Sequence, residues 1–274
     1  MSDEGVFVWD GAQLRPAPAG SEMLVADSWL VTDGAVGGFG HHRDRFTAAC
    51  AAAGVPADRT TAFLDAVPAL LPVAGRWFPR IECGPGAGGS GPGGPELRLR
   101  VRQAPPTTAT LVLAPHPEPD PRRAPRTKGP DLVMLGEVRN QAIALGAGEA
   151  VLCAADGTLL EGAYSAVVWW RGEELCLPDP ELPVLDSVTR RRVVEEAGRR
   201  GVAVRYERVT PAALDGLETW SLSALHGIRA VSGWRGCDVR AGAARRAPEW
   251  RAQLGADVTM LAPTTVSARG GVGR

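Results

Sequence analysis

Lys128 is the only lysine in this chain of 274 residues, which also contains 29 arginines. Arginine stays protonated and is a poor nucleophile, whereas a lysine in a desolvated pocket loses its proton and condenses with a carbonyl group. Because arginine rather than lysine occupies the other 29 positions of this kind, the single lysine is a candidate for a specific chemical role. Two interpretations follow: Lys128 forms a Schiff base, or it is an ordinary exposed cation.

Three other features carry groups that could take part in chemistry. Glu161 lies inside an apolar strand, although on an edge strand it would simply point to solvent. Ser187 and Thr189 begin a predicted helix, where free backbone amides and hydroxyls bind phosphate well. Helix capping alone would explain the same two residues. Ser223 and Ala224 form a small-residue turn between two predicted strands.

The composition indicates a globular protein without a polyanionic partner. Hydrophobic residues make up 45% of the chain and the net charge is -1, which argues against nucleic-acid binding. The five cysteines are scattered, without a CxxC pair or a histidine at zinc-ligand spacing, so we expect reduced thiols and no metal site. No signal peptide and no membrane-spanning segment is expected. These features predict a cytoplasmic protein.

The first half of the chain alternates between strand and helix patterns. Helices are predicted over residues 41–54 and 57–71, the second disturbed at Pro68. Strands are predicted near the N-terminus, within 22–34, over 75–83 and over 96–104, where leucine and valine alternate strictly with three arginines. The glycine-rich stretch between the last two strands lacks the GK[ST] ending of a phosphate loop.

The second half begins after a strand at 108–114 and a stretch with five prolines, the best domain boundary in the chain. Pro130 opens a helix, and the later strands predict an antiparallel meander interrupted by helices. The fold class is α/β (α+β) in two domains. We predict a small α/β domain over 1–115, a linker over 116–127, a larger domain over 128–253 and a mobile tail over 254–274.

Five short segments occur in an order and spacing that resemble one family. They are HRDRF at 42–46, TKGPD at 127–131, LLEGAYSAVVW at 159–169, LDSVTR at 185–190 and SALHGIRAV at 223–231. Together they are similar to the class IV aminotransferases, the pyridoxal-phosphate enzymes of fold type IV. The resemblance runs from about residue 28 to 234.

The resemblance implies a role for each matched residue. Lys128 would hold pyridoxal phosphate as a Schiff base and then move protons, and Glu161 would keep the pyridine nitrogen protonated so that the ring accepts electrons. A bidentate guanidinium suits the cofactor phosphate. The implied phosphate ligands are Arg45, Val188, Thr189, Ser223 and Ala224, the last two also lying near the substrate carboxylate.

The sequence departs from the family pattern at several positions. Asp131 and Ala166 replace two asparagines, Asp186 and Ser187 replace a proline-glycine pair, and Ala230 replaces a proline. The residues implied for the cofactor are retained despite these changes.

Within the family, the compact chain and the 223–231 turn look most like 4-amino-4-deoxychorismate lyase, which releases pyruvate and leaves 4-aminobenzoate for folate. Thr32 lies near the paired threonines of the lyases and would relay a proton, unless it is only a strand-end hydroxyl. Arg102 would bind a substrate carboxylate, unless the arginine face of its strand is exposed.

Other functions remain open. A transaminase of a D- or branched-chain amino acid, or an enzyme of specialised metabolism, would use the same residues with a small amino substrate. A non-catalytic binding or dimerisation module is the alternative from another class. The family also implies a homodimer, and a larger C-terminal pseudo-barrel domain with the cofactor between the two domains.

Overall fold

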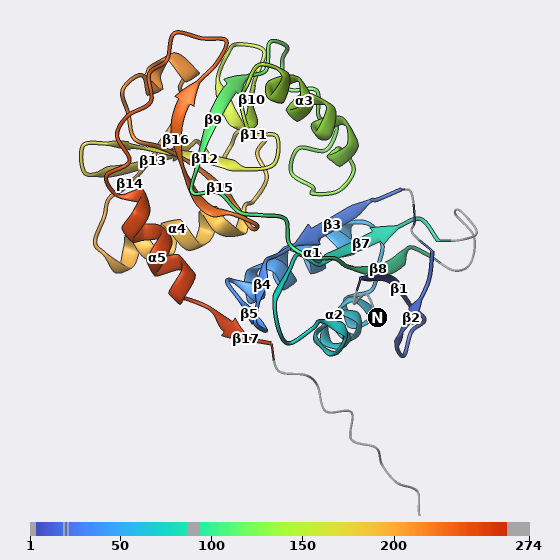
Figure 1. Cartoon of the computed structure of the whole chain (residues 1–274). Coiled ribbons are helices and arrows are strands. Elements are labelled where there is room, and N and C mark those ends of the chain that lie inside the picture. The colour runs from blue at the N-terminus through green and yellow to red at the C-terminus, as the bar shows by residue number, and fades with distance from the viewer. Residues whose placement is uncertain (1–3, 19, 21, 87–93, 262–274) are drawn as a thin grey trace, which may run out of the picture.

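The first part of the chain forms a five-stranded antiparallel sheet with the strand order β2-β1-β8-β7-β3 (Figure 1). The computed structural model describes residues 4–18, 20, 22–86 and 94–261. The centre of the predicted glycine-rich connection, residues 87–93, lies outside them. The strands of this sheet are β1 (Gly5–Trp9), β2 (Leu14–Pro16), β3 (Val25–Ser28), β7 (Arg80–Gly84) and β8 (Glu96–Val101).

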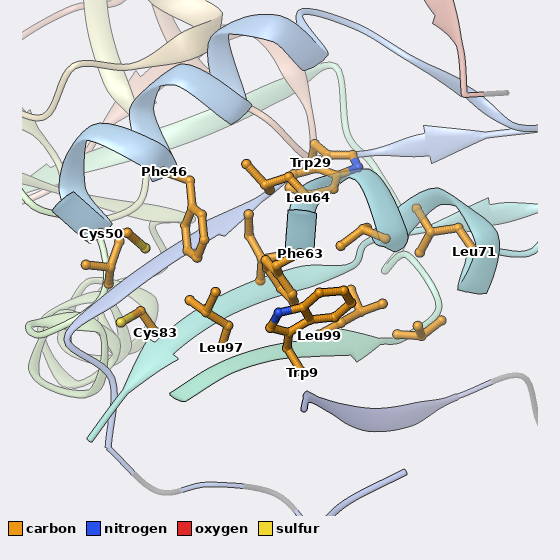
Figure 2. Close-up of a cluster of buried hydrophobic side chains, with 14 of the residues drawn as sticks. Trp9, Trp29, Phe46, Cys50, Phe63, Leu64, Leu71, Cys83, Leu97 and Leu99 are labelled. Carbon is orange, nitrogen blue, oxygen red and sulfur yellow. The ribbon is translucent and has the colours of Figure 1, made fainter. Parts of the chain in front are cut away.

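Two helices cover one face of this sheet and form its core. They are α1 (Phe39–Ala52) and α2 (Ala57–Ala66), followed by the short 3-10 helix η1 (Val67–Leu70). The end of α2 before Pro68 confirms the predicted disturbance. Figure 2 shows Phe46 of α1 and Phe63 of α2 above Leu97 and Leu99 of β8. Each such side chain contributes roughly 1.5–3 kcal/mol when fully buried, so the core fixes α1 against the sheet.

A second, four-stranded sheet joins the end of the described chain to strands of its first part. Its order is β17-β5-β4-β6, and β17 pairs with β5. The predicted tail at 254–274 is therefore wrong for its first residues, which complete a helix and a strand, while 262–274 lie outside the described residues. The strands are β4 (Val31–Thr32), β5 (Ala35–Val36), β6 (Arg76–Trp77) and β17 (Thr259–Met260).

The second part of the chain forms a curled eight-stranded sheet with the order β11-β10-β9-β16-β15-β12-β13-β14 (Figure 1). The predicted meander is wrong, because β9 runs parallel to both β10 and β16, and β13 runs parallel to β14. The strands are β9 (Thr110–Pro115), β10 (Glu149–Cys153), β11 (Leu159–Gly162), β12 (Ala166–Arg171), β13 (Glu174–Pro178), β14 (Val204–Glu207), β15 (Thr219–Ser223) and β16 (Gly227–Trp234).

The position of β9 changes the domain boundary. The predicted division at residue 115 assigns this strand to the first domain, but it pairs only within the eight-stranded sheet among the described strands. The chain thus passes from one sheet to the other over residues 102–109. The proline-rich stretch after β9 already belongs to the second part, and it brings Lys128 back toward β3.

Helices pack on the outer faces of the large sheet. The helix α3 (Leu132–Ala144) lies against β9 and β10, and α4 (Val188–Arg199) and α5 (Ala247–Ala256) lie against the β15–β16 hairpin. A 3-10 helix, η2 (Pro211–Leu214), precedes β15. The rings of Trp170, Trp220 and Trp250 pack with centroids 5.3–5.5 Å apart. This cluster anchors the hairpin whose turn contains Ser223.

Neither a membrane-crossing helix nor a metal-binding cluster occurs in the described part of the chain. No helix over residues 4–18, 20, 22–86 and 94–261 is long and apolar enough to cross a membrane. Within the same ranges, no three histidine, cysteine, aspartate or glutamate side chains gather as metal ligands would.

Candidate active site

A cavity of about 850 Å³ is lined by residues from both parts of the chain. Its lining includes the ends of β3 and β8, the segment that carries Lys128, the start of α4 and the turn between β15 and β16. All the predicted site residues except Thr32 line this one cavity, namely Arg45, Arg102, Lys128, Glu161, Val188, Thr189, Ser223 and Ala224.

Thr32 does not reach the cavity. It is exposed on β4, where it pairs with Ala35 and Arg76 of the small sheet. The hydroxyl from this segment that lines the cavity belongs to Ser28, which is buried at the end of β3. The prediction for Thr32 is corrected, because the chain turns away from the cavity between these two residues.

The backbone of the lysine segment is docked against β3. The Lys128 carbonyl accepts a hydrogen bond of 2.6 Å from the Ala26 amide. Gly129 has a φ of 137°, and a Cβ added there would lie 2.8 Å from the Ala26 nitrogen and 2.9 Å from the Val25 carbonyl carbon. Only glycine fits this close approach and this backbone conformation. The position of Lys128 therefore depends on Gly129, which allows the backbone to lie this close to β3.

We expect Gly129→Ala to lower the free energy of unfolding by about 2–4 kcal/mol, because the added methyl group meets backbone atoms and φ is unfavourable. Urea unfolding measures this change. The matched control is Gly172→Ala, which also has a positive φ, of 59°, but no atom within 4 Å of the added carbon. It is expected to cost only about 1–2 kcal/mol. Equal losses in the two variants would contradict the docking of Gly129 on β3.

Lys128 is surrounded by charge but has no partner for its amine. Its Nζ makes no hydrogen bond or ion pair with any residue of the described ranges. Burial lowers the pKa of Lys128 to about 8, and the charge of Arg45 adds to this effect, while Asp27 and Glu161 oppose it. At pH 7 about one-tenth of the amine is thus unprotonated, far more than for an ordinary lysine, and nucleophilic attack on a carbonyl requires this unprotonated form.

Glu161 is buried and held through one of its two oxygens. Its Oε1 accepts hydrogen bonds from Arg122 at 2.5 Å and from the Leu185 amide at 2.7 Å. Its Oε2 accepts none from the described residues. Arg122 is itself clamped by the carboxylate of Asp120. Burial raises the pKa of Glu161, and the charge of Arg122 opposes that rise. The bonded oxygen orients the carboxylate, and the other oxygen remains available for a ligand.

Arg45 is fixed by a buried carboxylate. Its Nε and Nη2 donate to the two oxygens of Asp27 at 2.8 and 2.7 Å, and its Nη1 donates to the Asp186 carbonyl at 2.9 Å. His42 Nδ1 lies 2.8 Å from Asp27 Oδ1. Burial disfavours the charged form, yet Arg45 and His42 hold the pKa of Asp27 well below its usual range. Two of the five N–H groups of Arg45 remain without a described partner, so it retains a donor edge.

The start of α4 presents backbone donors to the cavity. Ser187 caps the helix, because its Oγ accepts from the Arg190 amide at 3.3 Å. This confirms the capping interpretation for Ser187. Val188 and Thr189 occupy the first two helical positions, whose amides have no partner within the helix. The helix dipole adds positive potential at this point. The arrangement favours an anion at the start of α4.

Arg102 lies inside the cavity and not on an exposed strand face. Its Nε donates to the Phe78 carbonyl at 2.7 Å, and its guanidinium lies over the Phe78 ring. Burial lowers the pKa of Arg102 to about 10, with Arg80 and Arg100 contributing. Arg80 also lines the cavity. This end of the cavity is therefore strongly cationic and suits a carboxylate.

The departures from the family pattern have local explanations at three positions. The carboxylate of Asp131 accepts from the amides of Arg123 and Ala124 at 3.2 and 2.9 Å, which holds the chain before Lys128. The Ala230 amide donates to the Ala109 carbonyl, a bond that a proline there would lack. Ser187 supplies the cap described above. Nothing in the structure explains the alanine at position 166.

Several residues of the site were missed from the sequence. Arg122 falls within the stretch taken as a linker, and only the fold places it on Glu161. Asp27 did carry a signal, because a charged residue inside an apolar strand is seldom buried without a partner. Ser28 beside it gave no signal of its own.

Comparisons with known proteins agree with this geometry. The family model for class IV amino-transferases matches residues 24–234. No curated protein sequence matches the chain. A branched-chain aminotransferase from Thermoproteus uzoniensis, solved with norvaline, has 15% identity and a TM-score of 0.78, with 94% of this chain and 100% of that chain covered.

Two further solved structures have the same fold. A hypothetical aminotransferase from Mycobacterium tuberculosis, with α-ketoglutarate and PMP bound, has 20% identity over 92% of this chain and 98% of its own, with a TM-score of 0.77. A putative 4-amino-4-deoxychorismate lyase from Legionella pneumophila has 16% identity over 88% and 96%, with a TM-score of 0.73. The predicted fold class is confirmed. The chain belongs to the class IV aminotransferase family, whose members are pyridoxal-phosphate enzymes.

Proposed function

We propose that this protein is a pyridoxal-phosphate-dependent lyase that converts 4-amino-4-deoxychorismate into pyruvate and 4-aminobenzoate. The observation that carries the enzymatic part of the proposal is that Lys128 Nζ and Glu161 line one cavity, each with an atom free to bind a ligand. Those two groups are what a pyridoxal cofactor requires from a protein.

The residues present fit the cofactor. Lys128 would attach its aldehyde, the unpartnered Oε2 of Glu161 would face its ring nitrogen, and the start of α4 with Val188 and Thr189 would receive its phosphate. The free edge of Arg45 would add a charge-assisted contact. When bound, the cofactor supplies an electron sink for the carbon next to the substrate nitrogen.

The chain's own groups account for the lyase reaction. The Lys128 amine removes the proton from C4, the substrate carbon that bears the nitrogen, and the C3–O bond to the enolpyruvyl group breaks as the ring becomes aromatic. The departing enolpyruvate takes a proton at its methylene carbon. Ser28, in place of the predicted Thr32, is the hydroxyl of the β3–β4 segment that lines the cavity, and it would relay that proton. Arg102 would bind a substrate carboxylate.

A transaminase is the second candidate. The observation in its favour is that the aminotransferases from T. uzoniensis and M. tuberculosis have TM-scores of 0.78 and 0.77, against 0.73 for the lyase from L. pneumophila. In that reaction the Lys128 amine would take the proton from the same substrate carbon, the cofactor would carry the amino group, and a keto acid would be consumed as its acceptor. The same residues serve both reactions, so the distinction needs an assay.

We expect the purified protein to release pyruvate from 4-amino-4-deoxychorismate without any added keto acid. Lactate dehydrogenase coupled to NADH oxidation measures the pyruvate. The reason is that a lyase leaves the amine on the product and needs no acceptor. The control reaction offers D-alanine or L-leucine with α-ketoglutarate. Turnover only when an acceptor is present would contradict the lyase and favour the transaminase.

The same preparation tests the alternative that the protein is a non-catalytic binding or dimerisation module. A module would remain colourless and ignore added cofactor, whereas an enzyme turns yellow and is bleached by borohydride.

We also propose that the protein acts in the cytoplasm as a homodimer, in which a partner chain helps to close the cavity. Analytical ultracentrifugation tests the dimer.

A further inference from the structure

A layer of buried polar side chains lies at one end of the apolar interior of the eight-stranded sheet, and three of its members, Glu149, Ser165 and Arg229, line the cavity. On β10, Glu149 lies two residues before Val151, and on β16, Arg229 lies two residues before Val231. Both valines belong to the inner core cluster. Side chains two positions apart in a strand point to the same face. Glu149 and Arg229 therefore lie on the inner face.

Two serines belong to the same layer. Ser165 precedes Val167 of the inner core by two residues, and its Oγ donates to Glu149 Oε2 at 3.4 Å. Ser221 is paired with Arg229 across β15 and β16, and its Oγ accepts from Arg229 Nη2 at 3.3 Å. Arg229 is 6% exposed, so more than nine-tenths of it is buried.

The guanidinium of Arg229 is incompletely satisfied. Its Nε is buried without a hydrogen-bond partner, and its Nη1 donates to no residue in the described part of the chain. The nearest acidic atom is Glu149 Oε2, 3.9 Å from Nη2 and thus beyond hydrogen-bonding distance. A buried guanidinium whose only hydrogen bond among the described residues goes to one serine hydroxyl is costly, because its other N–H groups lack acceptors. An anion entering the cavity would supply them.

The surrounding charges leave this end of the cavity positive. Arg139 also lines the cavity and acts on the same groups as Arg229. Burial raises the pKa of Glu149 to about 7, so its carboxylate only partly neutralises the two arginines near neutral pH. Burial and the neighbouring arginines lower the pKa of His226 to about 4, which keeps that ring neutral. An incoming carboxylate meets net positive charge.

We infer that Arg229 binds a carboxylate of the substrate, separate from the one assigned to Arg102, and that the protein therefore selects dicarboxylic over monocarboxylic ligands. The inference rests on the proposed function, because it takes this cavity as the site of the amino substrate. Arg229 lies on β16 and Arg102 directly follows β8 of the other large sheet, and both line the same cavity. A ligand with a carboxylate at each end would satisfy both guanidinium groups.

The test is isothermal titration of the cofactor-saturated protein with glutarate and with butyrate, which differ by one carboxylate. We expect Arg229→Met to weaken glutarate binding at least tenfold and to leave butyrate binding within twofold. Arg229→Lys, which retains the charge but lacks the planar donor edge, is expected to give an intermediate loss. The matched control is Arg251→Met, because Arg251 donates to backbone carbonyls outside the cavity lining.

Unchanged glutarate affinity in both Arg229 variants overturns the inference, as does an equal loss for glutarate and butyrate. If Arg229→Met does not fold, the affinities for glutarate and butyrate are measured with Arg229→Lys, and the same two results overturn the inference. Borohydride fixation of the cofactor on Lys128 is measured in each preparation. Failure to fix the cofactor counts against the proposed function alone, because glutarate and butyrate can then be titrated into the cofactor-free protein, whose cavity has the same lining.

Discussion

Lys128→Ala is expected to abolish turnover. The change removes both the amine that holds the cofactor and the base that moves the substrate proton. General acid-base catalysis alone is worth about 10²–10⁴-fold, and the loss of covalent attachment adds to this. We expect kcat to fall by at least about 10⁴-fold, measured as pyruvate release or as amino transfer, whichever the parent protein performs.

The single lysine makes this result unusually easy to interpret. Borohydride reduction fixes the cofactor on an amine, and the chain offers only Lys128 and its N-terminal amino group. Peptide mass analysis of the parent should find the cofactor on the peptide that contains Lys128, and the Lys128→Ala protein should carry none. Retained activity in the variant, or a cofactor found only on the N-terminus, would contradict the assignment.

The buried amine of Lys128 should also lower the free energy of unfolding of the cofactor-free protein, and the size of this loss should depend on pH. Burial lowers its pKa from 10.5 to about 8 in the folded state. Between these values the unfolded chain holds a proton that the folded protein has released, so stability rises with pH. We expect Lys128→Met to raise the free energy of unfolding by roughly 1–3 kcal/mol below pH 8 and to give no gain above about pH 10.5. Lys128→Arg, which stays charged, is the control and should give no gain.

Glu161→Gln is the second large effect, with an expected loss of about 10²–10³-fold in kcat. An amide does not keep a ring nitrogen protonated as a carboxylate does, so the ring would become a poorer acceptor of electrons. The variant should still bind the cofactor on Lys128, because that amine is untouched. The measurements are steady-state kinetics and the yield of borohydride-fixed cofactor. Unchanged kcat would contradict the role of Glu161.

The control for Glu161→Gln is Glu207→Gln. Glu207 also pairs with an arginine, Arg171, and it accepts a hydrogen bond from Trp169, but it does not line the cavity. Its substitution also removes an ion pair with an arginine, but it should leave kcat within about twofold of the parent value. A similar loss of kcat in both variants would indicate a general effect of breaking an ion pair.

Local patterns in the sequence were sufficient for the elements that carry the site. The alternation of β8, the cap at Ser187 and the small-residue turn at Ser223 are properties of a few neighbouring residues, and each was found where it was predicted. Lys128 could be singled out for the same reason, because it is the only lysine of the chain. The role of Glu161 was predicted from the order of the five matched segments, since its immediate surroundings also fitted a side chain that points to solvent.

Only the tertiary structure decided which distant groups meet. The parallel pairing of β9 with β16, the ion pair of Arg122 with Glu161 and the docking of Gly129 on β3 join segments between 39 and about 120 residues apart. Ser28 reaches the cavity and Thr32 does not, although both are hydroxyls of one short segment. Such contacts depend on burial and packing between elements, and local residue patterns contain little information about them.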